Sequence, residues 1–235
     1  MRPANLACLL VLSMGSLRAE VAPGAETLAK AARTGALLTE ESLLQNGLDP
    51  NLRDGYGVTP LYYAVSFNQT RAVQVLLSHR ADPNIEVSSR SSEFPATPLQ
   101  SASYLGNLRI ASLLIEAGAR VSAAGPTGRT ALHFAVLAMH LDLMRYLIEK
   151  GAGIDARDAE GTSPLDEAVW RGYLDAVAIL LANGARLNEP EPKTGATPIN
   201  EAAYRGNTRL VKYLLQFHPD LAIKDKNGYS PLAGF

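Results

Sequence analysis

The side chains that could carry out chemistry are scattered along this chain. Its four histidines are spread over the sequence without the spacing of a metal site. Asp166 and Glu167 are adjacent in a predicted helix, so their side chains point in different directions and do not form a carboxylate pair. The chain has no Gly-rich phosphate loop, no His-Glu-x-x-His, no Cys-x-x-Cys and no Gly-x-Ser-x-Gly turn. The sequence therefore predicts no catalytic residue, no metal, no cofactor and no small-molecule substrate.

The elements that must position the side chains come from an internal repeat. A Thr or Ser, followed in five of six cases by Pro and then by an apolar segment, stands at residues 59, 97, 130, 163, 197 and 230. The intervals between these positions are 38, 33, 33, 34 and 33 residues. A period near 33 indicates a stack of similar small units.

One unit reads as two helices followed by a projecting turn. Thr or Ser before Pro is a helix start, because the hydroxyl accepts a free amide hydrogen and Pro at the first position sacrifices no bond. Gly106, Gly172 and Gly206 end the first helix at the same offset, and an apolar second helix follows. Asp-x-x-Gly segments such as 158–161 then supply tight turns.

This pattern resembles the ankyrin repeat, and the resemblance covers nearly everything after residue 25. It implies an all-α fold, a solenoid of stacked helix-turn-helix units with projecting β-turn or hairpin loops. It also implies a structural role for His133, which stands at the His of the family's Thr-Pro-Leu-His and is expected to form hydrogen bonds between turns. Met139 stands where other units have the Gly that ends the first helix, so we expect a distorted or strained turn there.

The repeat divides the chain into segments. We predict a signal peptide at 1–19, a linker at 20–25 and an ankyrin-repeat domain at 26–235. The domain comprises a degenerate N-terminal cap repeat at 26–57, repeats at 58–96, 97–129, 130–162, 163–196 and 197–229, and an incomplete last unit at 230–235. In the cap, we expect Glu26, Lys30 and Arg33 to lie on the side that has no neighbour. Because the family closes with a polar cap that is missing here, we expect the natural chain to continue beyond Phe235.

The resemblance also predicts where a partner protein binds. Such stacks make partner contacts with the two residues before the Gly that ends each first helix, on the concave face, and with turn tips. The concave candidates are Phe67, Tyr104, Leu137, Trp170, Arg171, Tyr204 and Arg205, and the turn-tip candidates are Tyr56, Arg157, Glu160, Lys193 and Lys226. Aromatic and Arg side chains dominate interface energetics, which favours binding. The alternative is that these rings pack between neighbouring first helices.

The start of the chain reads as an export signal. Arg2 precedes an apolar run from Leu6 to Leu12, and Ala19 is our preferred cleavage site. Cleavage removes Cys8, the single cysteine, so the mature chain needs no disulfide. We expect export to the periplasm or the exterior, and no membrane insertion after cleavage; the alternative is a cytoplasmic protein that keeps these residues.

Charge and motifs together define the predicted function. The formal net charge of −1 gives no basic surplus for nucleic acid or anionic lipid. The main hypothesis is a non-enzymatic module that binds an unidentified protein. The alternatives are the interaction arm of a larger enzyme or effector whose remainder lies beyond Phe235, and a cytosolic regulatory ankyrin protein.

Overall fold

The computed structural model describes residues 22–87 and 95–231. The predicted signal peptide and all but the first two residues of the incomplete last unit therefore lie outside the described residues. The described residues form α-helices joined by turns and loops, with one short 3-10 helix and no strand among them. The all-α prediction is confirmed for this part of the chain.

The chain forms two compact units, one up to Pro126 and one from Thr127. The helices of the first unit are α2 (Ala25–Thr34), α3 (Leu37–Gln45), α4 (Pro60–Ser66), α5 (Thr70–Ser78), α6 (Pro98–Leu105) and α7 (Leu108–Glu116). Those of the second are α8 (Ala131–Leu137), α9 (Leu141–Glu149), α10 (Pro164–Trp170), α11 (Leu174–Ala182), α12 (Pro198–Tyr204) and α13 (Thr208–Leu214), followed by the 3-10 helix Leu215–Phe217.

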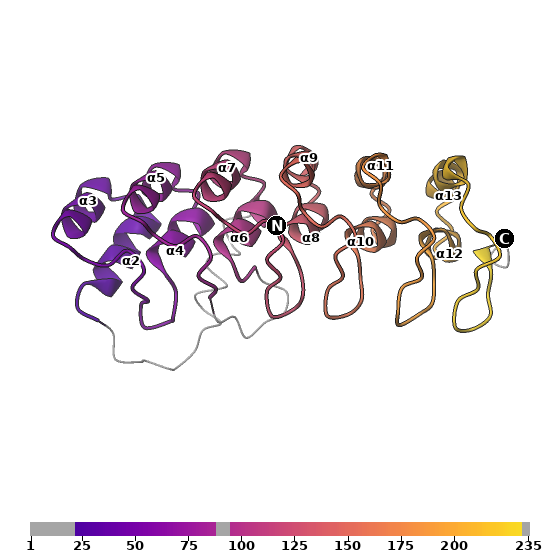
Figure 1. Ribbon diagram of the computed structural model, residues 1–235, viewed down its shortest axis with the longest axis horizontal. Helices are drawn as coiled ribbons and strands as arrows, with labels where there is room; N and C mark the ends of the chain where they lie inside the picture. The colour runs from indigo at the N-terminus through magenta and orange to yellow at the C-terminus, as the bar shows by residue number, and fades with distance from the viewer. Residues whose placement is uncertain (1–21, 88–94, 232–235) are drawn as a thin grey trace. The chain divides into compact units, whose positions relative to one another are not determined.

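Both units use the same layering. Within each, the first helices of the pairs form one row, the second helices form another, and the loops project on the side of the first helices (Figure 1). The first-helix row is α2, α4 and α6 in one unit and α8, α10 and α12 in the other. Because the loops and the first helices lie on the same side, side chains from both can reach one ligand.

The first helices begin where the hydroxyl residues predict. Thr59, Thr97, Thr130, Ser163 and Thr197 are the residues that cap α4, α6, α8, α10 and α12. Four of these helices have Pro at the start, and the last four of the five close a capping box with their third helical residue. A capping box satisfies two backbone donors that the helix itself leaves free. These local bonds set the position at which each helix begins.

The third helical residue also ties its helix to the next loop. His133 accepts from the Thr130 amide at 3.1 Å through Nδ1, and its Nε2 donates to the Thr162 carbonyl at 3.1 Å. The structural role predicted for His133 is confirmed. At the equivalent position, Gln100 donates to the Ala123 carbonyl at 3.1 Å and Asn200 to the Tyr229 carbonyl at 3.1 Å.

The residue between the two helices of a pair has a positive φ. Gly106, Gly172 and Gly206 have φ values of 73°, 71° and 65°, as predicted. Met139 has a φ of 61° at the same place. Helix α8 ends before it and α9 begins after it, as in the other helix pairs. Of the two expected outcomes, a distorted or a strained turn, the structure shows the strained one, because Met139 itself adopts the left-handed conformation and the turn keeps its shape. The strain stays in that residue's backbone.

One prediction about the N-terminal cap is corrected. Arg33 does not lie on a side without a neighbour, because its guanidinium carbon is 6.0 Å from the centre of the Phe67 ring. Phe67 in turn packs partly buried against a core of Tyr62, Tyr63 and Val87. A cationic head over an aromatic face is a favourable contact, so Arg33 is drawn toward the following repeat.

Candidate functional site

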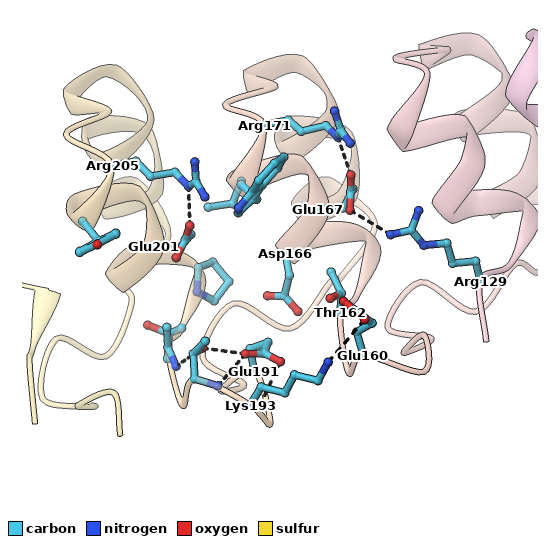
Figure 2. Close-up of a pocket in the computed structure, with 17 residues that line it drawn as sticks. Arg129, Glu160, Thr162, Asp166, Glu167, Arg171, Glu191, Lys193, Glu201 and Arg205 are labelled. Atoms are coloured by element: carbon cyan, nitrogen blue, oxygen red, sulfur yellow. Dashed lines mark hydrogen bonds and ion pairs between the residues drawn. The ribbon is translucent and has the colours of Figure 1, made fainter. Parts of the chain in front are cut away.

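The second unit contains a groove of about 580 Å³ on the side of its first helices and loops. Its walls come from α10, α12 and the loops that precede them, and Arg129 is added from the loop before α8 (Figure 2). One groove therefore collects side chains from four successive repeats. We call it the α10–α12 groove. It is lined by Arg129, Glu160, Thr162, Asp166, Glu167, Val169, Trp170, Arg171, Glu191, Lys193, Thr194, Ala196, Thr197, Pro198, Glu201, Tyr204 and Arg205.

Trp170 and Tyr204 form the aromatic part of the groove. They are the last residues of α10 and α12, and 51% and 86% of their surfaces are exposed. The guanidinium carbons of Arg171 and Arg205 lie 5.3 and 4.5 Å from the centre of a Trp170 ring. These cation–π contacts hold the indole in place from its own helix and from the next repeat.

Each of these guanidinium groups is held by a carboxylate one turn earlier. Glu167 pairs with Arg171 on α10, and Glu201 pairs with Arg205 on α12 (Figure 2). Arg129 reaches the same Glu167 at 3.9 Å and bonds Asp158 at 3.2 Å. The helical end of the groove is therefore a network of paired charges around an exposed indole.

The loop end of the groove is dominated by acidic side chains. Figure 2 shows Asp166 extending from α10 toward the loops, where Glu160, Glu191 and Lys193 lie. Lys193 pairs with Glu160 at 3.6 Å, and so joins two successive loops. The Glu191 carboxylate accepts from the Lys193 and Thr194 amides at 3.0 and 2.7 Å.

Two carboxylates at the loop end have shifted pKa values. Burial raises the pKa of Asp166 above its ordinary value, although hydrogen bonds from Ser163 oppose that shift. Burial also acts to raise the pKa of Glu191, but the bonds from Thr194 and the Lys193 amide outweigh it and lower the pKa. Glu191 is thus a fully ionised carboxylate at neutral pH.

The groove brings together six of the residues predicted for partner contact. Trp170, Arg171, Tyr204 and Arg205 come from the predicted concave set, and Glu160 and Lys193 from the turn tips. Leu137 is half-buried and does not line the groove. Tyr56, Phe67 and Tyr104 belong to the first unit, where Tyr56 is half exposed and the other two are partly buried.

Two predicted turn tips are engaged within the second unit. Arg157 pairs with Asp166 at 3.4 Å and Glu189 at 3.5 Å, and donates to the Gly161 and Pro190 carbonyls. Its side chain is 23% exposed, and its contact with a partner stays a prediction. Lys226 donates to the Pro192 carbonyl at 2.6 Å, which also ties one loop to the next.

The motif comparison missed the other charged residues of the groove, which are Arg129, Asp166, Glu167, Glu191 and Glu201. Glu167 and Glu201 each stand four residues before an Arg of the predicted set, a spacing that predicts ion pairs on a helix. That signal was available in the sequence. Arg129 had no such signal, because its contacts with Asp158 and Glu167 bridge two repeats.

The described residues hold no group of three or more His, Cys, Asp or Glu arranged for a metal ion. None of the helices in that part of the chain is long and apolar enough to cross a membrane.

Comparison with known proteins identifies the repeat. A family model described as ankyrin repeats (3 copies) matches residues 4–87, 28–125 and 99–191, and one described as ankyrin repeats (many copies) matches residues 171–215. The chain belongs to the ankyrin-repeat family. The predicted solenoid class is confirmed by a solved structure, the ankyrin repeat domain of Bcl-3, titled a member of the IkappaB protein family. It matches with a TM-score of 0.79 and 28% identity over 88% of this chain and 92% of that one.

The curated relatives of this ankyrin-repeat protein are much longer than it is. Glycerophosphocholine phosphodiesterase gde1 of Schizosaccharomyces pombe is 36% identical over 106 residues, which are 45% of this chain and 9% of that protein. Palmitoyltransferase AKR1 of Lachancea kluyveri is 28% identical over 205 residues, 86% of this chain and 23% of that protein. The chain thus spans less than a quarter of the length of either relative.

Proposed function

We propose that this ankyrin-repeat protein is a non-enzymatic module that binds a partner protein in the α10–α12 groove. Ankyrin repeats are protein–protein interaction modules, which supports the general class. The observation that carries the proposal is the exposure of Trp170 and Tyr204, 51% and 86%, on the wall of one groove. Rings that only packed between neighbouring helices would be buried.

The groove is also preorganised for binding. Trp170 lies against two guanidinium groups, and each of these is fixed by its own glutamate. A partner therefore meets an indole whose position is already set, and less conformational entropy is lost on binding. Trp, Tyr and Arg are the residue types that most often dominate interface energetics, and the groove has all three.

Affinity capture from the native source tests this proposal. The double variant Trp170→Ala with Tyr204→Ala is expected to capture the partner about tenfold less well than the wild type, or worse. Truncating two anchor side chains removes several kcal/mol of binding free energy. Leu38→Ala is the matched control, since Leu38 is 85% exposed on α3 in the other unit. Equal capture by the double variant and the control, with all proteins folded by circular dichroism, would show that the groove is not the binding site.

A second proposal concerns the natural context of the domain. The two relatives described above include this repeat within longer proteins that are named as enzymes. This favours an interaction arm of a larger protein as the alternative role. The mass of the protein isolated from its native source decides between the two, since a mass well above 25.1 kDa requires additional chain.

We also propose that the protein is exported, and the support is the sequence of residues 1–19. Arg2, the apolar run from Leu6 to Leu12 and the small residue Ala19 follow the order of a secretory signal. N-terminal sequencing of the native protein is expected to begin at Glu20. A native protein that begins at Met1 and fractionates with the cytosol would show that this proposal is wrong.

A further inference from the structure

In the α10–α12 groove, every cation has an ion-pair partner but not every carboxylate does. Five carboxylates and four cations line it. Every one of the four cations has a carboxylate within 4 Å: Arg129 with Asp158, Arg171 with Glu167, Arg205 with Glu201 and Lys193 with Glu160. The carboxylates are not all matched in this way. Glu191 makes hydrogen bonds to its own loop and no ion pair among the described residues.

The imbalance is located at the loop end of the groove. Asp166 and Glu191 both line this end, and the charge of Glu191 adds to the burial that raises the pKa of Asp166. Asp166 is paired at 3.4 Å with Arg157, which does not line the groove. A ligand that enters the loop end of the groove therefore faces these two carboxylates, while the cations that line the groove are already paired.

A second hollow continues the same surface. It has a volume of about 550 Å³ and shares Glu201 and Tyr204 with the α10–α12 groove. Its described lining adds Asp225 and Tyr229 and includes no Lys or Arg. Negative charge and exposed tyrosine thus extend one repeat further along the second unit.

We propose that the α10–α12 groove selects an extended segment of a partner protein that carries basic side chains. A Lys or Arg enters the loop end of the groove and faces Glu191 and Asp166, while the neighbouring part of the segment lies on Trp170 and Tyr204. This inference deepens the proposed function and depends on it. Its basis is charge complementarity together with the aromatic wall.

The repeat spacing predicts how the basic side chains are placed. Neighbouring helices pack about 8–10 Å apart, so equivalent hollows recur at that interval. In a polyproline II segment each residue rises about 3.1 Å and every third side chain points the same way, a repeat of about 9 Å. Two basic residues three positions apart can therefore enter the two hollows together.

Trp170 supplies a direct readout, because it is the only tryptophan of the chain. The probe is a ten-residue peptide, Gly-Pro-Pro-Lys-Pro-Pro-Lys-Pro-Pro-Gly, with both ends blocked. Its matched forms carry Gln or Glu in place of both Lys. Binding is expected to shift the Trp170 emission to shorter wavelength, since a ligand covers a half-exposed indole, and the shift is titrated at low and high salt.

The Lys peptide is expected to bind at least about tenfold more tightly than the Gln peptide. Added salt should weaken the binding of the Lys peptide, because salt screens the attraction between its ammonium groups and the carboxylates of the groove. Asp166→Asn with Glu191→Gln should remove most of this preference. Asn200 shows that Asn can serve at the position of Asp166, since it accepts from the Thr197 amide at 3.2 Å. Glu26→Gln with Asp142→Asn removes two exposed carboxylates elsewhere and should change nothing.

Three results would overturn the inference. In the first, the Gln or Glu peptide shifts the emission at the same concentrations as the Lys peptide. In the second, the variant Asp166→Asn with Glu191→Gln binds the Lys peptide as tightly as the wild type does. In the third, none of the peptides binds. If no peptide binds but Trp170→Ala with Tyr204→Ala still abolishes partner capture, the proposed function stands and the preference for a basic segment is wrong. Tighter binding of the Glu peptide would assign the groove to an acidic partner.

Discussion

Glu40 occupies a core position that the other second helices fill with apolar side chains. Five residues after the turn residue, those helices place Val73, Ala111, Met144, Val177 and Val211, all buried. Glu40 is 0% exposed, and neither carboxylate oxygen has a hydrogen-bond partner among the described residues. Burial, reinforced by Glu41, raises the pKa of Glu40 to about 7. Ionisation of Glu40 in the cap repeat is therefore expected to lower the free energy of unfolding as pH rises.

The pH dependence has a definite sign. The folded state holds the Glu40 proton more tightly than the unfolded chain, so between pH 4.5 and about 7 the native protein binds more protons. Stability contributed by this group is complete below that window and falls as pH rises through it. Glu40→Val should raise the free energy of unfolding by about 1–3 kcal/mol at pH 8 and by less at pH 4.5. Urea unfolding measures both, with Glu26→Gln as a neutral control; an equal gain at the two pH values would contradict this account.

Met139 provides a second test at the residue scale. Its φ of 61° is one that Gly adopts without steric cost. Met139→Gly should therefore stabilise the protein by about 1 kcal/mol. Gly206→Ala should destabilise it by a similar amount, because Gly206 has a φ of 65° and an added Cβ meets no atom within 4 Å. Thermal unfolding compares the two, and opposite shifts in melting temperature are the expected result.

At the scale of elements, one helical position carries the link between successive repeats. The third residue of the first helix reaches the next loop in four repeats, through Tyr62, Gln100, His133 and Asn200, and the last three of these also close a capping box. Asp166 holds the same position but cannot donate a hydrogen bond. Arg157 takes over that function, because it bonds Asp166 and also the Pro190 carbonyl of the next loop.

Substitution of His133 tests this link. His133→Gln should preserve the fold because Gln100 makes equivalent bonds to its cap and to the next loop. His133→Leu should cost about 2 kcal/mol, because it leaves the buried Thr130 amide without its acceptor and removes the bond to the Thr162 carbonyl. Burial lowers the pKa of His133, so its folded form resists protonation and stability falls as pH drops below about 6.5. His133→Gln should remove that loss between pH 7 and 5. Denaturant titrations at both pH values measure it, and equal pH sensitivity of the two proteins would argue against the link.

The sequence predicted the helices and turns better than the contacts between repeats. Hydroxyl and Pro pairs predicted the starts of the first helices, and Gly106, Gly172 and Gly206 predicted the turns, because these signals are local. The contacts of Arg33, Arg129 and Arg157 were not predicted, because their partners lie in another repeat. The buried carboxylate of Glu40 was missed for the same reason, since a single unit does not show which face its neighbour covers.

At the scale of the whole molecule, the repeat explains why a groove forms without a catalytic motif. Equivalent positions on α10 and α12 bring Trp170, Tyr204 and their flanking Arg residues to one wall, and the preceding loops add the acidic end. The sequence predicted the aromatic and Arg members from the unit alignment. It did not predict the excess of carboxylates, which depends on how ion pairs are shared between repeats. The consequence is a fixed surface, and we propose that a protein partner binds to it.

Site-specific crosslinking tests that surface most directly. A photoreactive benzoylphenylalanine replaces Tyr204 in the full chain, and Leu38 is replaced in the same way as the control, since both side chains are highly exposed. Irradiation in the native source, followed by mass spectrometry, is expected to yield one protein adduct from position 204 and none from position 38. Adducts that are the same from both positions, or absent from position 204 while the protein is folded and abundant, would contradict the proposed binding function of the α10–α12 groove.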